Sequence, residues 1–120
     1  MQNDVQITVR DHAHSDALDA RIREKTAKLE KVCPRITSCH VVVSAPHHHQ
    51  QRKNVFMVRI NITFPGGEVV VTRDNHDDVY VLLRDAFVAA RRELEKALRQ
   101  HDGGAKLHAQ RAARLPEENI

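Results

Sequence analysis

The sequence predicts an α+β protein in which four strands and two helices follow the order β-α-β-β-β-α. Apolar residues alternate with polar ones in four short segments, and recur every three or four positions in two longer segments. Turn-forming residues separate these segments. Each helix has one apolar stripe and the sheet has one strongly apolar side, so we expect a four-stranded sheet with both helices packed on one face.

The first strand and the first helix are expected before Pro34. Between residues 5 and 9, Val and Ile alternate with polar residues, as in a strand with one buried face. Ser15 is a good N-cap. The apolar stripe that follows at helical spacing consists of Leu18, Ile22, Leu29 and Val32. Pro34 predicts the end of this helix, because proline restricts the residue before it and cannot donate a backbone hydrogen bond.

Three further strands are expected between Ile36 and Arg73. The segment Ile36–Ser44 is rich in β-branched residues, which favour strands. In Phe56–Phe64 the even-numbered positions are apolar, and the odd-numbered face is largely polar and expected to meet solvent. Pro65-Gly66-Gly67 supplies turn chemistry, so Glu68–Arg73 is predicted to return as the second strand of an antiparallel hairpin.

The second helix is predicted to begin near Asn75–Asp77, where a side-chain oxygen can cap it. An apolar stripe then runs from Val79 to Leu98. Gly103-Gly104 is predicted to stop the helix. We therefore expect one domain over residues 1–102 and a flexible C-terminal tail over residues 103–120, which contains few apolar residues.

Composition narrows the class of protein only slightly. The formal net charge of +3 favours an anionic partner but does not require one. The polar, alternating N-terminal stretch is unlike a signal peptide and no segment is long and apolar enough to span a membrane, so a cytoplasmic location is expected. Cys33 and Cys39 lack metal-ligand or CxxC spacing, which predicts two reduced thiols.

The most informative polar residues are two rows of cations, one on each predicted helix. On the first helix, one border of the apolar stripe carries Arg21, Lys25, Lys28 and Lys31. On the second helix, one edge of the stripe carries Arg84 and Arg91, and the outward face beyond it carries Arg92 and Arg99. Two helices side by side would bring both rows to one outer surface, which could bind the phosphates of a folded or double-stranded RNA. Interspersed acids leave a second interpretation open, in which the same residues form a solvated face with i,i+4 ion pairs.

Other candidate sites are weaker. His47-His48-His49 could bind a metal, but adjacent residues are poorly placed to chelate one ion, so we expect no metal site and no cofactor. His76 could contact phosphate or help to cap the helix, and capping is favoured. Tyr80 could stack on a base, although packing is the commoner use of a single tyrosine. No GxSxG turn and no phosphate-cradling glycine loop is present, so we do not expect an enzyme.

The order of elements, the segment Lys28–Lys31 and the segment His76–Tyr80 resemble the ribosome hibernation-promoting factor and ribosome-associated translation inhibitor family. The resemblance covers nearly all of residues 4–101. The segments Arg35–Cys39, Val41–Val43, Ala45–His47 and Pro65–Val71 resemble a subgroup whose domain is often followed by a cold-shock-like domain. No such domain follows here, so we expect a stand-alone or shortened member.

This resemblance implies binding to the small ribosomal subunit and its rRNA, in the channel for mRNA and tRNA, with reversible inhibition of translation. It implies no membrane partner and no small-molecule substrate, and we expect a monomer or weak dimer. The eight cations of the two rows are the expected RNA-binding residues. Two alternatives are a general structured-RNA binder and a dimerising protein-interaction module. Whether the protein promotes or prevents ribosome pairing is open.

Overall fold

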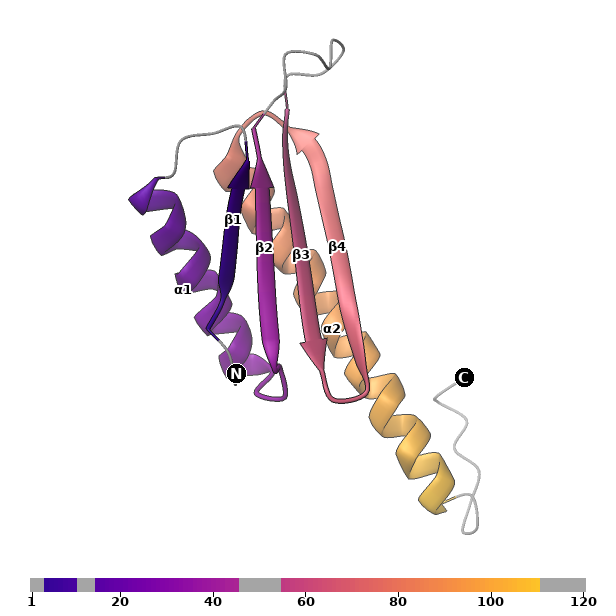
Figure 1. The fold of residues 1–120 in the computed structure, drawn as a ribbon. Helices are drawn as coiled ribbons and strands as arrows, with labels where there is room; N and C mark the ends of the chain where they lie inside the picture. The colour runs from indigo at the N-terminus through magenta and orange to yellow at the C-terminus, as the bar shows by residue number, and fades with distance from the viewer. Residues whose placement is uncertain (1–3, 11–14, 46–54, 111–120) are drawn as a thin grey trace.

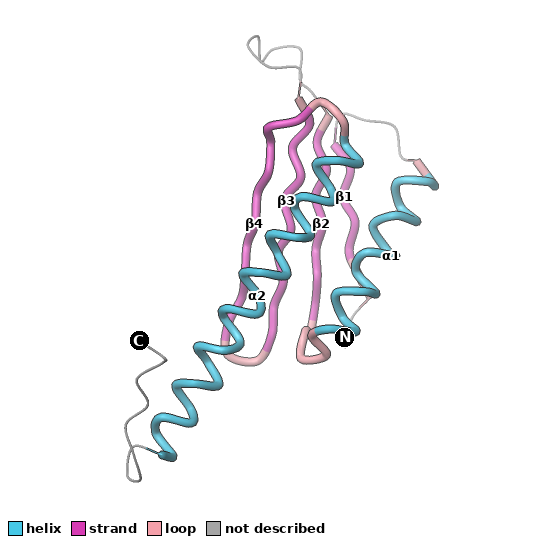
Figure 2. Tube along the Cα trace, turned by 180° about the vertical axis from the view of Figure 1, so that it is seen from behind, coloured by secondary structure: helices cyan, strands magenta, loops and turns pink. Residues whose placement is uncertain are grey.

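The computed structural model describes the backbone of residues 4–10, 15–45 and 55–110, and side chains as far as Gln100. The elements, in chain order, are β1 (Gln6–Arg10), α1 (Asp16–Val32), β2 (Ser38–Ser44), β3 (Phe56–Phe64), β4 (Gly67–His76) and α2 (Val79–Gln110). The predicted α+β class and element order are confirmed. Both helices cover the same face of the sheet, behind it in Figure 1 and in front of it in Figure 2.

The sheet has the strand order β1-β2-β3-β4. β1 and β2 are parallel, with Ile7 beside Val41, whereas β2, β3 and β4 form an antiparallel meander. The turn between β3 and β4 consists of Pro65 and Gly66, and Gly66 has a φ of 99°. A proline followed by a residue with positive φ is typical of a type II turn, which favours glycine at the second position.

The core lies between the helices and the inner face of the sheet. Alternate strand residues such as Val41, Val43 and Ile60 point to this face and are fully buried, as is Ile22 of α1. The outer face is mainly polar, as predicted for the odd positions of β3. There, Thr8 Oγ1 and His40 Nε2 lie 2.8 Å apart on neighbouring strands.

Helix α1 has the predicted ends. The Leu18 N–H donates to Ser15 Oγ at 3.2 Å, which satisfies one of the unpaired donors of the first turn. The Cys33 N–H donates to the Leu29 carbonyl at 2.8 Å just before Pro34. Lys31 lies in the last turn, where a cation complements the negative end of the helix dipole.

The predicted start of α2 is wrong by a few residues. β4 continues to His76, which pairs with Phe56 of β3, so Asn75 belongs to the hairpin rather than to a helix cap. The cap is Asp78, whose Oδ1 accepts from the Tyr80 N–H at 2.9 Å. The Asp78 N–H in turn donates to His76 Nδ1 at 3.1 Å, which supports the structural role favoured for that histidine.

The predicted end of α2 is also wrong, because the helix continues through Gly103 and Gly104 to Gln110. A glycine inside a helix costs only about 1 kcal/mol relative to alanine, and the segment that follows contains good helix formers. The predicted tail therefore begins as helix, and residues 111–120 lie outside the described residues. No helix in the part of the chain that the structure describes combines the length and the apolar content needed to cross a bilayer.

Candidate functional site

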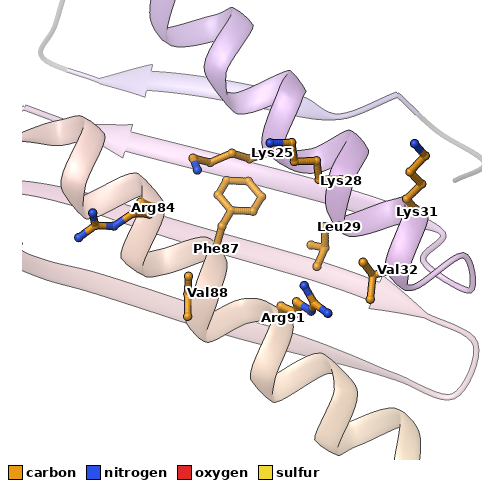
Figure 3. A pocket seen from close by; sticks show the side chains of 9 residues that line it. All are labelled: Lys25, Lys28, Leu29, Lys31, Val32, Arg84, Phe87, Val88 and Arg91. Atoms are coloured by element: carbon orange, nitrogen blue, oxygen red, sulfur yellow. The ribbon is translucent and has the colours of Figure 1, made fainter.

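A groove of about 420 Å³ lies between α1 and α2 on the side of the helices away from the sheet core. Its lining consists of Lys25, Lys28, Leu29, Lys31 and Val32 from α1 and Arg84, Phe87, Val88 and Arg91 from α2. Figure 3 shows the Phe87 ring between the two helices, with lysines on the α1 side and arginines on the α2 side. The lining therefore combines an apolar floor with five cations, and it contains no acidic side chain.

Helical spacing explains why these residues meet. On α2, Arg84, Val88 and Arg91 are four and three positions apart, so they lie along one side of the helix. On α1, Lys25, Lys28 and Val32 are three and four positions apart, so they also share one side of their helix. α2 crosses β3 and β4, whereas α1 lies on the β1 side of the sheet (Figure 2). Residues of both helices line the groove.

Three of the five cations have acidic neighbours on their own helix. Arg84 Nη2 lies 3.3 Å from an Asp85 oxygen, Arg91 Nε lies 3.1 Å from Glu95, and Lys28 Nζ lies 3.9 Å from Glu24. These pairs are solvent-exposed, and such pairs contribute at most about 1 kcal/mol. An incoming phosphate can therefore compete for the same cations.

Lys25 and Lys31 have no acidic partner within ion-pair distance among the described residues. Arg23, which does not line the groove, is different. Its guanidinium donates to Asp19 at 2.9 Å and to Asp4 at 3.3 Å, and these bonds raise the pKa of Arg23. The two α1 lysines without an acidic partner thus line the groove, whereas the arginine with two acidic partners does not.

Five of the eight predicted RNA-binding residues line the groove, namely Lys25, Lys28, Lys31, Arg84 and Arg91. Arg21, Arg92 and Arg99 are exposed but do not line it. The Arg21 guanidinium lies over the Tyr80 ring, 5.5 Å from its centroid, and is 3.6 Å from Glu24. Arg21 therefore covers one face of the Tyr80 ring, which was a candidate for stacking on a base. RNA binding by all eight residues stays a prediction.

The apolar floor was missed by the sequence analysis. Val32 was included in the buried stripe of the first helix, yet it is 44% exposed, and Val88 was not considered although it is 51% exposed. The signal was present for Val88, because a helix places it on the same side as Arg84 and Arg91. The sequence thus placed a valine between two arginines that were predicted to bind phosphate.

The remaining candidates do not add to this site. Burial raises the pKa of the Cys39 thiol to about 11. Both cysteines are free, as predicted, and both are buried. Burial also raises the pKa of Cys33; Glu95 raises it further, whereas Arg91 lowers it. No cluster of three or more metal-ligating side chains occurs within the described residues, and His47-His48-His49 lies outside them.

The fold and the groove define a class of small β-α-β-β-β-α proteins with a basic surface built by two adjacent helices. The chain belongs to the sigma 54 modulation protein / S30EA ribosomal protein family, whose model matches residues 5–102. This match confirms the resemblance to the ribosome hibernation family.

The solved structures that share the fold include the following two. A ribosomal subunit interface protein from Coxiella burnetii is 19% identical, with a TM-score of 0.66 over 78% of this chain and 94% of that one. The N-terminal domain of Protein Y from Thermus thermophilus is 21% identical, with a TM-score of 0.63 over 80% of this chain and 98% of that one. No curated protein matches the chain by sequence.

Proposed function

We propose that this protein is a ribosome-associated translation inhibitor that binds the rRNA of the small ribosomal subunit through the groove between α1 and α2. The observation that carries the proposal is the convergence of five cations from two helices on one groove that no acidic side chain lines. Family membership and the fold shared with a ribosomal subunit interface protein support the ribosome as the partner.

The physical basis of the proposed binding is phosphate neutralisation. Folded RNA displays phosphates at regular intervals, and each Lys or Arg that approaches one releases a condensed counterion. Arginine also offers a planar set of donors that can grip a phosphate with two hydrogen bonds. Cations on both sides of the groove can contact phosphates on both sides of an inserted RNA strand or ridge.

Inhibition then needs no chemical step. A protein that occupies the mRNA and tRNA channel of the small subunit excludes those ligands by competition, and its release restores the ribosome. The proposed partner places the protein in the cytoplasm, and the action requires no cofactor or small-molecule substrate. Affinity set largely by phosphate contacts also predicts that binding weakens steeply as the salt concentration rises.

Charge reversal in the groove tests this proposal. The variant Lys28→Glu/Arg84→Glu changes one exposed cation on each helix, and we expect at least ~100-fold weaker cosedimentation with small subunits. The matched control is Arg10→Glu/Arg59→Glu, which makes the same change in net charge on the outer face of the sheet. We expect the control to bind nearly as wild type, and both variants to keep their melting temperature because all four sites are exposed.

The outcomes separate the proposal from its alternatives. Equal loss of binding in both double variants would indicate a general charge effect and contradict a groove-specific interface. Equal affinity of the wild type for a free RNA duplex and for intact subunits would favour a general RNA binder instead. Self-association that is insensitive to salt, without affinity for RNA, would favour a dimerising interaction module.

A further inference from the structure

Phosphate binding alone does not explain the floor of the groove. Val88 and Val32 are about half exposed there, above the largely buried side chains of Leu29 and Phe87. Exposed apolar surface is costly in water, whereas a phosphate needs only donors and positive charge. The floor therefore indicates a ligand that has an apolar surface as well as negative charge.

We propose that the groove takes an unpaired nucleotide of RNA, with its base on the apolar floor and its flanking phosphates on the lysines and arginines of the rim. This inference rests on the proposed function, because it assumes that RNA is the partner. In a regular A-form duplex the bases are stacked on one another and only edges, 2′-hydroxyls and phosphates are accessible. A base in a bulge or loop has a free face that can pack on Val88 and Val32.

The chemistry of the lining fits both parts of a nucleotide. The volume of about 420 Å³ lies in the range of about 300–1,000 Å³ typical of small-molecule pockets. Arg91 points its guanidinium toward α1 (Figure 3), where the planar group can either stack on a base or bind a phosphate. An uncharged apolar peptide would cover the floor but offer no negative charge to the five cations of the lining, so charge complementarity favours RNA.

Exposed hydrophobic side chains are concentrated on the helix side of the protein. Four large hydrophobic side chains are exposed among the described residues, and three of them, Val32, Tyr80 and Val88, belong to α1 and α2. The fourth, Val70, lies on the outer face of the sheet beside Asn61 of β3. Val70 therefore provides a matched control of the same residue type and similar exposure.

The test compares two RNA hairpins that differ only in one bulged nucleotide, which is 2-aminopurine so that its fluorescence reports stacking. We expect the wild type to bind the bulged hairpin about tenfold more tightly than the paired one, because a base that covers the floor removes apolar surface from water. Val32→Ser/Val88→Ser should lose most of that preference while retaining its affinity for the paired hairpin. Val70→Ser should behave as wild type.

Cosedimentation with small subunits is measured for the same proteins, which separates this inference from the proposed function. If the wild type binds subunits but does not prefer the bulged hairpin, the inference is overturned and the proposed function stands. A preference that persists in Val32→Ser/Val88→Ser also overturns it. If the wild type does not bind subunits, the proposed function fails and this inference fails with it. Melting temperatures of the variants confirm that they are folded.

Discussion

An exposed valine on the helix side of this protein, Val88, can be compared with one on the outer face of the sheet, Val70. The surroundings of the two side chains differ. Val88 on α2 is flanked by Arg84 and Arg91 and faces the lysines of α1 across a groove. Val70 on β4 lies on the outer face of the sheet, opposite Asn61 on the neighbouring strand. The two side chains have similar exposures of 51% and 44%.

The cations on these two sides of the protein also differ in whether they form a candidate binding site. Arg10 and Arg59 on the outer face belong to separate strands, with β2 between them, and neither lines a groove. On the helix side, two rows of cations converge because α1 and α2 lie side by side on one sheet. A basic surface with a specific ligand therefore depends on how the elements are arranged as well as on how many cations they carry.

The largest expected effect comes from the core that supports both sides. Ile60 and Arg59 are neighbours on β3 and point to opposite faces, one fully buried and the other exposed. Ile60→Ala leaves a cavity between the sheet and α2, and we expect a loss of about 2–5 kcal/mol in the free energy of unfolding. Arg59→Ala should change it by less than about 0.5 kcal/mol. Urea denaturation measures both, and similar losses would contradict the assignment of the two faces.

A medium effect is expected for single cations within the helix side. Lys31 lines the groove and Lys96 does not, although both are exposed on a helix. If Lys31 contacts one phosphate, Lys31→Ala should reduce the slope of log affinity against log salt concentration by about one unit. Lys96→Ala should leave the slope unchanged. The measurement is subunit binding over a salt series, and equal slopes for the two variants would remove Lys31 from the interface.

The smallest effect concerns the contact that joins the two helices near the start of α2. Arg21 lies over the Tyr80 ring, an arrangement worth about 0.5–1 kcal/mol at an exposed site. A double-mutant cycle with Arg21→Gln and Tyr80→Leu measures the coupling in the free energy of unfolding. We expect a coupling of that size, and a value near zero would mean that the contact does not help to hold α1 against α2.

Most of the fold was predictable because its signals are local. The alternation in β3 predicted Phe56–Phe64 with its observed bounds, and Ser15 and Pro34 marked the ends of α1. The start of α2 was not predictable in this way. Asn75 has the chemistry of a helix cap, but pairing with β3 keeps the chain extended to His76, and that pairing depends on residues far away in the sequence.

Most of the charged lining of the candidate site was predictable for a related reason. Helical spacing placed the lysines on one border of the first helix and Arg84 and Arg91 on one edge of the second. The groove was not predictable, because its width depends on where each helix lies on the sheet. A helical projection assigned Val32 to the core, yet this residue is at the end of α1, where it borders the groove instead of the sheet. Polar rows were thus easier to predict than the exposed apolar floor between them.

Site-specific photocrosslinking tests the central claim most directly. The variants Val88→p-benzoylphenylalanine and Val70→p-benzoylphenylalanine place the same reactive side chain on opposite sides of the protein, and each is bound to small ribosomal subunits and irradiated. We expect crosslinks to rRNA from position 88 and none from position 70. Crosslinks from position 70, with none from position 88, would contradict the account.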